Sequence, residues 1–368
     1  MRNRKSYTLP VFPHQFFFFL GLRIRHSLLK LADRLLPAPV AVYDKAQGLW
    51  ISGAIGTACD LGIADLLVPG PKSIMELARK TGTEEDHLYR LMRTLSGEGI
   101  FRELPGRIFL NNRLSEALAE GEESMKYMIM HQFGETNMTL FIHLTESIRT
   151  GHGNYQKFLG KKVFNHLQDN PRNNDIYNKA MNNSSRLIAV ALLSAYDFRH
   201  YKKIVDVGGG QGVLLNIICS RYDHLEGILF DQPHVIKNSA SVLGESAPDA
   251  RIRVVSGNFF KDIPPDADCY FMKNILHAFS DDDGVRLLKR IFTVMDDEGR
   301  LVILETVTKS DNRSTFGKRL DLMMMTGTDG GKERTREEFE ALLDSSGFKI
   351  TRIVRTISPF SVIEAMKK

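Results

Sequence analysis

The sequence predicts an α/β fold for the C-terminal half of the chain, with a mostly parallel sheet covered by helices on both faces. Short runs rich in Val, Ile and Leu alternate with helical stretches after residue 200, which is typical of a parallel sheet. The last two runs are joined through a short Ser-Pro link, which suits an antiparallel hairpin at the sheet edge. The seven predicted strands are KIVDVGG, LEGILFD, RIRVVSG, DCYFMKNIL, GRLVILETV, GFKITRIVRT and FSVIEAMKK.

The chain is long enough for two domains, each with its own core. We expect an N-terminal arm over residues 1–38, a helical domain over 39–172 and the α/β domain over 173–368. Hydrophobic residues make up 43% of the sequence and charged residues 25%, which excludes wholesale disorder. The cysteines form no CxxC pair, which argues against a disulfide framework or a cysteine zinc site and makes a cytoplasmic location the default (Cys59, Cys219, Cys269).

The positive charge of the chain lies in the N-terminal arm. Residues 1–34 contain seven Lys or Arg and one Asp, a balance of +6, so the rest of the chain sums to 5 − 6 = −1 and is not basic. The run HQFFFFLGL is short for a signal peptide and continues into the amphipathic pattern RIRHSLLKLADRLLP. We expect a packing or dimer-embracing helix; a membrane-surface contact and a targeting peptide are the alternatives. No run is long enough to span a membrane.

A helix, turn, helix and hairpin pattern follows the arm. SIMELARKTG and TEEDHLYRLMRTLSGEG are expected to form two helices, and IFRELPGRIFLNN a hairpin, which is the winged-helix order. Winged helices often bind DNA, and a recognition helix must then neutralise phosphates. The second helix argues against DNA binding, because it begins with three acidic residues and contains only two arginines to offset their charge (Glu84, Glu85, Asp86, Arg90, Arg93).

The motif VDVGGGQGVLL at residues 205–215 predicts a strand, a glycine turn and a helix start, which bring backbone N–H groups close to a ligand. Asp231 ends the next strand, where a carboxylate can accept both ribose hydroxyls of a nucleoside. Val213 occupies the third position of G-x-G-x-x-G, which disfavours a nicotinamide cofactor. Asp206 before the turn suits a positively charged ligand, such as the amino-acid part of S-adenosylmethionine. A purely structural glycine turn is the alternative.

Two further strand ends carry candidate site residues. GNFF follows the third strand and places Asn258 where it could bond an adenine edge and Phe259 where it could stack on the ring. His277 follows the fourth strand. Because ligands of open α/β sheets bind beyond the carboxyl ends of the strands, we expect these residues to converge with Gly208 and Asp231 on one edge.

With these motifs, the chain resembles the S-adenosylmethionine-dependent O-methyltransferases of the plant caffeate and isoflavone type, which include acetylserotonin methyltransferase and bacterial relatives. The resemblance runs from about Tyr177 to the C-terminus and rests on VDVGGGQG, FDQPHVI, GNFF, FMKNILHAFSDDD, LVILETV and GGKERTREEFEALLDSSGF. It implies a Rossmann-like methyltransferase sheet, and the winged-helix region matches the family's dimerisation domain more loosely. A homodimer that methylates a hydroxyl of a small, aromatic or apolar acceptor is therefore expected.

The resemblance also implies roles for individual residues. His277 corresponds to the catalytic base, Glu305 and Glu333 match the glutamates that flank it, and Met181 would lie against the substrate. S-adenosyl-L-methionine would contact residues along the strand ends, with Ser185 near its carboxylate. The predicted cofactor site consists of Asp206, Gly208, Gly210, Asp231, Asn258, Phe259, Lys273 and Ser185.

The chemistry supports a base at His277. Methyl transfer depends mainly on alignment of the reacting atoms, and a neutral histidine can take the proton of a phenol with a pKa of about 10. A satisfied loop histidine is the alternative. The acidic run Asp281–Asp283 could suggest a metal, but Ser280 as a helix cap and carboxylates at the positive end of the helix dipole explain it better. No metal is predicted.

Three departures from the family pattern surround the base. Ala278 and Phe279 stand where Asp-Trp is usual, Asn258 replaces Asp, and Asn274 replaces a frequent Trp. They affect acceptor orientation more than cofactor binding, because Asn258 can still bond adenine through its carbonyl oxygen. The alternatives are C-methylation, or cofactor-assisted hydroxylation or decarboxylation of a secondary metabolite, on the same scaffold, and a cofactor-sensing winged-helix regulator.

Overall fold

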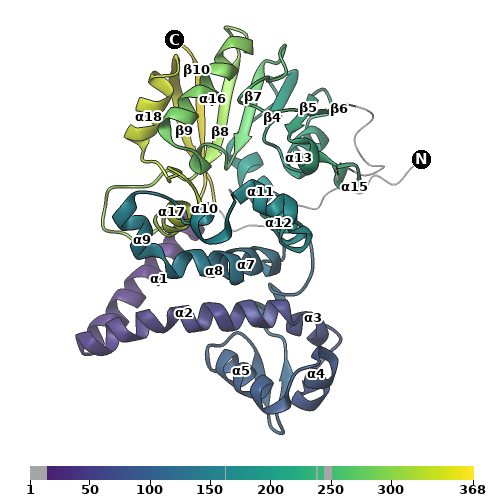
Figure 1. Cartoon of the computed structure of the whole chain (residues 1–368), viewed down its shortest axis with the longest axis vertical. Helices are drawn as coiled ribbons and strands as arrows, with labels where there is room; N and C mark the ends of the chain where they lie inside the picture. Colours follow the sequence, from purple (N-terminus) through teal and green to yellow (C-terminus); the bar gives the residue numbers. More distant parts are fainter. Residues whose placement is uncertain (1–14, 162, 238, 244–250) are drawn as a thin grey trace. The chain divides into compact units, whose positions relative to one another are not determined.

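The computed structural model describes residues 15–161, 163–237, 239–243 and 251–368 (Figure 1). The chain divides into two compact units, and the larger one contains the seven-stranded sheet near the C-terminus. Of the described residues, the larger unit contains 15–25 and those within His143–His166 and Ser185–Lys368, and the smaller one contains His26–Ile142 and Leu167–Ser184.

The larger unit is built on a seven-stranded sheet with the order β6-β5-β4-β7-β8-β10-β9 (Figure 1). The first five strands in this order pair in parallel, and β10 pairs antiparallel with both β8 and β9. The predicted parallel sheet with an antiparallel edge hairpin is confirmed. The strands are β4 (Lys203–Val207), β5 (Glu226–Asp231), β6 (Ile252–Ser256), β7 (Cys269–Lys273), β8 (Arg300–Glu305), β9 (Phe348–Arg355) and β10 (Ser361–Lys367).

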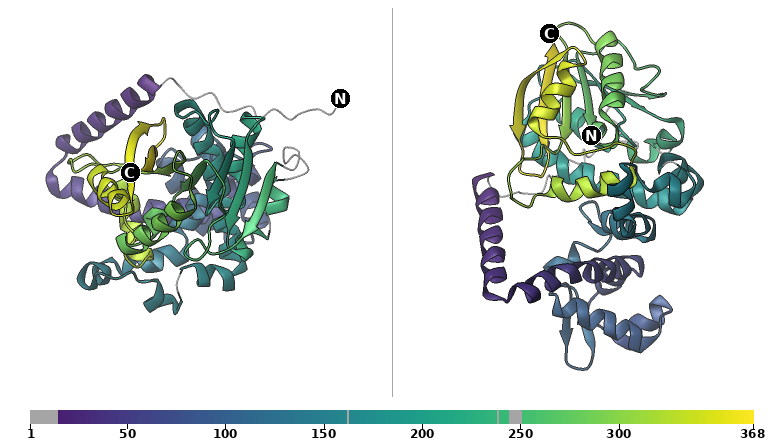
Figure 2. Two further views of the ribbon diagram at one scale, coloured as in Figure 1. Left: turned by 90° about the horizontal axis from the view of Figure 1, so that it is seen from above. Right: turned by 60° about the vertical axis from the view of Figure 1, so that its left-hand side comes forward.

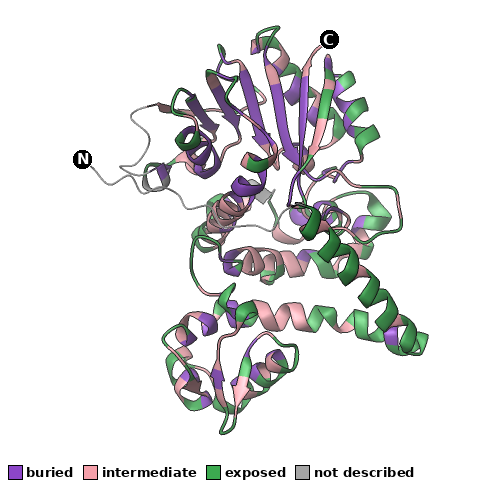
Figure 3. Ribbon diagram, turned by 180° about the vertical axis from the view of Figure 1, so that it is seen from behind, coloured by how far each residue is buried: buried purple, intermediate pink, exposed green. Residues whose placement is uncertain are grey.

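Two hydrophobic clusters cover the opposite faces of this sheet. Phe271 belongs to one cluster and the next residue, Met272, to the other, as the two-residue period of a strand requires. Helices flank both faces (Figure 2), and the central strands are buried along most of their length (Figure 3). This two-sided burial explains the nearly continuous apolar runs of the sequence.

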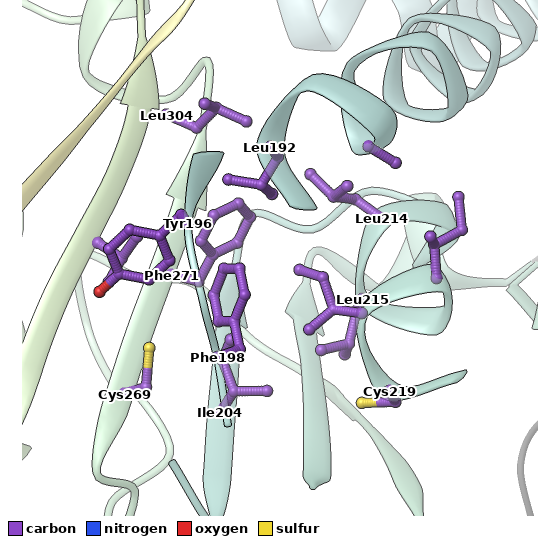
Figure 4. Close-up of a cluster of buried hydrophobic side chains, with 14 of the residues drawn as sticks. Leu192, Tyr196, Phe198, Ile204, Leu214, Leu215, Cys219, Cys269, Phe271 and Leu304 are labelled. Atoms are coloured by element: carbon purple, nitrogen blue, oxygen red, sulfur yellow. The ribbon is translucent and has the colours of Figure 1, made fainter. Parts of the chain in front are cut away.

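The first cluster is lined by α12 and α13 (Figure 4), and the second by α16 and α18. Short helices and a 3₁₀ turn connect the strands. The helical elements of this part of the chain are α9 (Leu144–Thr150), α10 (Tyr155–Leu159), α11 (Val163–Asp169), α12 (Pro171–Ala195), α13 (Val213–Arg221), α14 (Pro233–Ile236), α15 (Ser239–Leu243), the 3₁₀ turn (Leu276–Ala278), α16 (Asp281–Val294), α17 (Phe316–Gly327) and α18 (Arg336–Asp344).

The smaller unit contains the helix, helix and hairpin order that the sequence predicts. α4 (Ile74–Thr81) and α5 (Glu85–Gly97) precede the hairpin of β2 (Arg102–Leu104) and β3 (Ile108–Leu110), and β1 (Lys72–Ser73) pairs with β3. A capping box fixes the start of α4, because the Ser73 hydroxyl accepts from the Glu76 N–H while the Glu76 carboxylate accepts from the Ser73 N–H. The core between these elements includes Leu77, Met92, Leu95 and Phe109.

Two long helices begin the described part of the chain. They are α1 (Gln15–Leu35) and α2 (Ala38–Asp60), separated at Pro37. In the residues that the structure describes, no helix is long and apolar enough to cross a membrane. The remaining helices are α3 (Ile63–Leu67), α6 (Arg113–Glu116), α7 (Lys126–Phe133) and α8 (Glu135–Ile142).

Candidate active site

The glycine turn between β4 and α13 leaves open space beside its backbone. Gly208, Gly210 and Gly212 have φ angles of +73°, +64° and +85°, a region that glycine adopts without strain. A Cβ added at Gly208 would lie 2.4 Å from the side chain of Ile275, whereas one at Gly210 would meet no atom within 4 Å. The turn is therefore packed against the protein at its first glycine and open to a ligand at its second.

The carboxylate of Asp231, at the end of β5, is bonded to this turn. Its Oδ2 accepts from the Gly210 N–H at 2.8 Å, and its Oδ1 accepts from the Gln232 N–H at 2.6 Å. Burial raises the pKa of Asp231, and the two backbone hydrogen bonds oppose that shift. Each carboxylate oxygen keeps a further lone pair. An open glycine turn with an adjacent carboxylate fits the ribose of a nucleoside, so these residues fit S-adenosylmethionine.

Asp206 is buried behind the turn, and the half-buried Lys273 influences its charge. Only 2% of Asp206 is exposed, and its carboxyl lies beneath Gly209. Burial raises the pKa of Asp206 to about 7, and the Lys273 ammonium partly opposes that rise. Burial also lowers the pKa of Lys273 to about 8, and Asp206 opposes that fall. Direct contact of either side chain with the cofactor stays a prediction.

Three phenylalanine rings cluster beside the glycine turn. Phe259 lies edge-on to Phe260 and Phe279, with ring centroids 4.9 and 5.8 Å apart, and Phe279 lies 5.2 Å from Phe260. Asn258 holds the turn that carries two of these rings, because its Oδ1 accepts from the Phe260 N–H at 2.9 Å. That oxygen can accept a second hydrogen bond. The sequence singled out Phe279 only as a departure near the base, and its place in this cluster was not predicted.

His277 lies on the 3₁₀ turn between β7 and α16, and its ring is held by one carboxylate. Its Nδ1 lies 2.7 Å from Glu333 Oε1, with 12% of the histidine side chain exposed and 1% of the glutamate. Because a carboxylate only accepts, this contact assigns the proton to Nδ1 and leaves Nε2 as the accepting nitrogen. Burial lowers the pKa of His277, but the Glu333 hydrogen bond and the charges of Glu305 and Glu333 outweigh it, so the pKa is raised.

The second predicted glutamate contacts the backbone of the turn rather than the ring. Glu305 Oε1 accepts from the N–H groups of Ile275 and His277 at 3.0 and 3.2 Å. Burial raises the pKa of Glu305, and His277 opposes that rise. The two glutamates therefore differ in what they hold, which the sequence did not indicate.

Glu333 is itself fixed by neighbours that sequence reasoning missed. The Thr306 hydroxyl donates to Glu333 Oε2, and the Glu333 N–H donates to Asp321 Oδ1 at 2.8 Å. Arg334, the next residue in the chain, is fully buried. The motif GGKERT contains both Glu333 and Arg334, and it was the only signal for Arg334 in the sequence.

Two predicted residues lie on α12, outside these contacts. Ser185 is buried and belongs to the larger unit. Met181 lies one helical turn earlier and belongs to the smaller unit. Their contacts with cofactor and substrate stay predictions.

The acidic run at the start of α16 is a helix N-terminus. The Ser280 hydroxyl accepts from the Asp283 N–H at 3.2 Å, as the cap interpretation predicts. Asp281 pairs with Lys332 and Arg334. Within the described ranges, no group of three or more His, Cys, Asp or Glu side chains is placed to hold a metal ion.

Two family models and many known proteins match the chain. An O-methyltransferase domain matches residues 141–349, and an O-methyltransferase dimerisation domain matches residues 43–121. The phenazine O-methyltransferase PhzM of Lysobacter antibioticus is 35% identical over 332 residues, covering 90% of this chain and 96% of that protein. The mitomycin biosynthesis 6-O-methyltransferase of Streptomyces lavendulae is 33% identical over 318 residues, covering 86% and 90%.

Solved structures agree with these matches. The LaPhzM structure has a TM-score of 0.87 at 33% identity and covers 90% of this chain and 100% of its own. Human N-acetylserotonin methyltransferase in complex with SAM has a TM-score of 0.83 at 25% identity, covering 90% and 98%. The first model alone spans more than half of the chain. The chain therefore belongs to the S-adenosylmethionine-dependent O-methyltransferase family.

Proposed function

We propose that this enzyme methylates a hydroxyl of a small, aromatic or apolar molecule with His277 as the general base. The observation that carries this proposal is the 2.7 Å contact between His277 Nδ1 and Glu333, because it directs the basic lone pair of Nε2 away from the glutamate. Relatives named for phenazine, mitomycin and bergaptol support a compact acceptor with conjugated rings.

The chain's own residues would bind and align the reactants. S-adenosylmethionine supplies an activated methyl group when bound. The backbone at Gly208 and Gly210 would contact it, Asp231 would accept from its ribose hydroxyls, and Phe259 would stack on its adenine. Alignment of the acceptor oxygen then provides most of the rate gain.

The proton of the acceptor hydroxyl would move to His277 Nε2. A phenol has a pKa of about 10, so its proton must leave as the new carbon–oxygen bond forms. Glu333 on the opposite ring nitrogen stabilises the imidazolium, and the buried charge of Glu305 adds to that effect.

The proposal is tested with the purified protein, S-adenosylmethionine and a panel of phenols, by mass spectrometry and NMR of the products. We expect at least one acceptor to gain a methyl group on oxygen. A methyl group on carbon would support C-methylation instead. Hydroxylated or decarboxylated products would indicate the other use of this scaffold.

Glu333→Gln is expected to move the acid limb of the kcat/KM profile to lower pH. Only neutral His277 accepts a proton, so the rate falls as pH drops through the pKa of His277. That pKa is raised by the Glu333 hydrogen bond and carboxylate charges, although burial opposes them. Removing the charge lowers the pKa, and losing a charge-assisted bond lowers the plateau rate by roughly 10- to 100-fold. An unchanged limb in pH–rate measurements would exclude His277 as the titrating group.

We also propose a homodimer whose interface extends over α1. Nine apolar side chains on this helix are 39 to 76% exposed. Six of them share one face, because the second three follow the first three at an interval of 11 residues. Exposed apolar residues continue into the region that the dimerisation model matches, at Tyr43, Leu49 and Trp50. This continuity favours a second copy of the chain as the partner. The six residues are Phe17, Leu20, Ile24, Leu28, Leu31 and Leu35.

The double substitution Leu28→Glu and Leu31→Glu is expected to dissociate this dimer. Removing two leucines that the proposed dimer would bury raises the dimer Kd by roughly 10²- to 10⁴-fold, which sedimentation velocity measures. Lys30→Gln, on the polar side of α1, should leave the dimer intact. A dimer that survives the double substitution would contradict the proposal. If the wild type binds anionic vesicles and the double variant does not, the face is a lipid-binding surface instead.

A further inference from the structure

Arg334 is fully buried, and its guanidinium bonds the turn that carries His277. Nη1 donates to the Leu276 carbonyl at 2.7 Å, and Nη2 donates to the Phe279 carbonyl at 2.9 Å. Nε donates to Asp281 Oδ1 at 2.9 Å, at the first residue of α16. One planar group thus joins the residue before the histidine, the end of the turn and the helix that follows.

The same turn is held through its N–H groups by Glu305. That carboxylate accepts from Ile275 and His277, whereas Arg334 donates to the carbonyls of Leu276 and Phe279. Hydrogen bonds with one charged partner are roughly twice as strong as neutral ones. Glu305 and Arg334 therefore fix the backbone of this turn from its N–H groups and from its carbonyls. The same turn carries the His277 ring, which contacts Glu333.

The segment before Arg334 packs directly on this backbone. A Cβ added at Gly331 would lie 2.6 Å from the His277 carbonyl oxygen and 3.0 Å from the carbonyl carbon of Ala278. Glu333 and Arg334 are neighbours on this segment. Arg334 bonds the turn while Glu333 bonds the ring, so together they set the position of the imidazole relative to its carboxylate.

We propose that Arg334 is a positioning residue for methyl transfer, which acts by fixing the His277 turn so that Nδ1 stays on Glu333 and Nε2 faces the acceptor hydroxyl. This inference rests on the proposed role of His277 as the base. Arg334 contacts the backbone of the turn and acts through the imidazole. A displacement of about 1 Å at the reacting groups costs on the order of 100-fold in rate.

The test compares Arg334→Met and Arg334→Lys in the full-length enzyme. We expect kcat to fall by about 100-fold in Arg334→Met. Arg334→Lys should lose less, because it keeps a charged donor, but should stay below the wild type, because an ammonium lacks the planar fork that serves two carbonyls. The affinity for S-adenosylhomocysteine should stay unchanged in both. Arg334→Lys keeps the positive charge, so a lower pKa of His277 in an NMR titration reports a loosened Nδ1 contact with Glu333.

Arg336→Met is the matched control, because Arg336 is an exposed arginine of the same segment that pairs with Glu340. It should change neither kcat nor the His277 titration. A lower Tm in Arg334→Lys with the wild-type kcat and titration would overturn the proposal and leave Arg334 a purely structural role. His277→Ala assayed in parallel separates the two hypotheses: a retained rate there rejects the base, whereas the titration still tests Arg334.

Discussion

His277→Ala is expected to lower kcat for methyl transfer by about 10²- to 10⁴-fold, the contribution of a general base. The affinity for S-adenosylhomocysteine, measured by calorimetry, should not change, because the glycine turn and Asp231 contact each other without the imidazole. The loss should be larger for weakly acidic hydroxyls than for acceptors that are already ionised, since an ionised acceptor needs no base.

The control for this prediction is His200→Ala, which removes an exposed histidine outside the site. It should leave kcat and cofactor affinity at wild-type values. If His277→Ala retained the wild-type rate with every hydroxylated acceptor, a general base at this position would be excluded. Glu333 would then hold a histidine with a structural role.

The parallel sheet could be predicted because its strands are buried on both faces and therefore appear as short apolar runs. The order β6-β5-β4-β7-β8-β10-β9 could not be deduced from those runs, since it depends on which strands the crossovers bring together. The antiparallel hairpin was predictable for a local reason, because only a short link at Ser358-Pro359 joins its strands.

The sequence predicted which residues form the site, but not which atoms those residues contact. Glu305 and Glu333 lie 28 and 56 residues from His277, and sequence similarity placed both beside it. Which carboxylate bonds the ring and which bonds the backbone depends on side-chain directions that sequence spacing does not encode. Arg334 was missed for a related reason, since its partners are carbonyl oxygens, which every residue carries.

Asp231→Ala is expected to raise the Kd for S-adenosylhomocysteine by at least ~100-fold, because one hydrogen bond to a charged partner contributes about 1.5–3 kcal/mol and two ribose hydroxyls are involved. Calorimetry on the purified protein measures this change. Asp223→Ala, at an exposed aspartate before β5, is the control and should bind normally. Normal cofactor affinity in Asp231→Ala would show that the carboxylate does not contact the ribose.

The pH dependence of binding separates the charge of Asp231 from its shape. Burial raises the pKa of this carboxyl, against the two backbone hydrogen bonds, so it takes up its proton at a higher pH than an ordinary aspartate does. The ionised form accepts more strongly from the ribose hydroxyls, and affinity should therefore drop as pH decreases through that pKa. Asp231→Asn keeps the shape without the charge, so its weaker affinity should lack this pH dependence. If Asp231→Asn showed the same acid limb as the wild type, another group would be responsible for it.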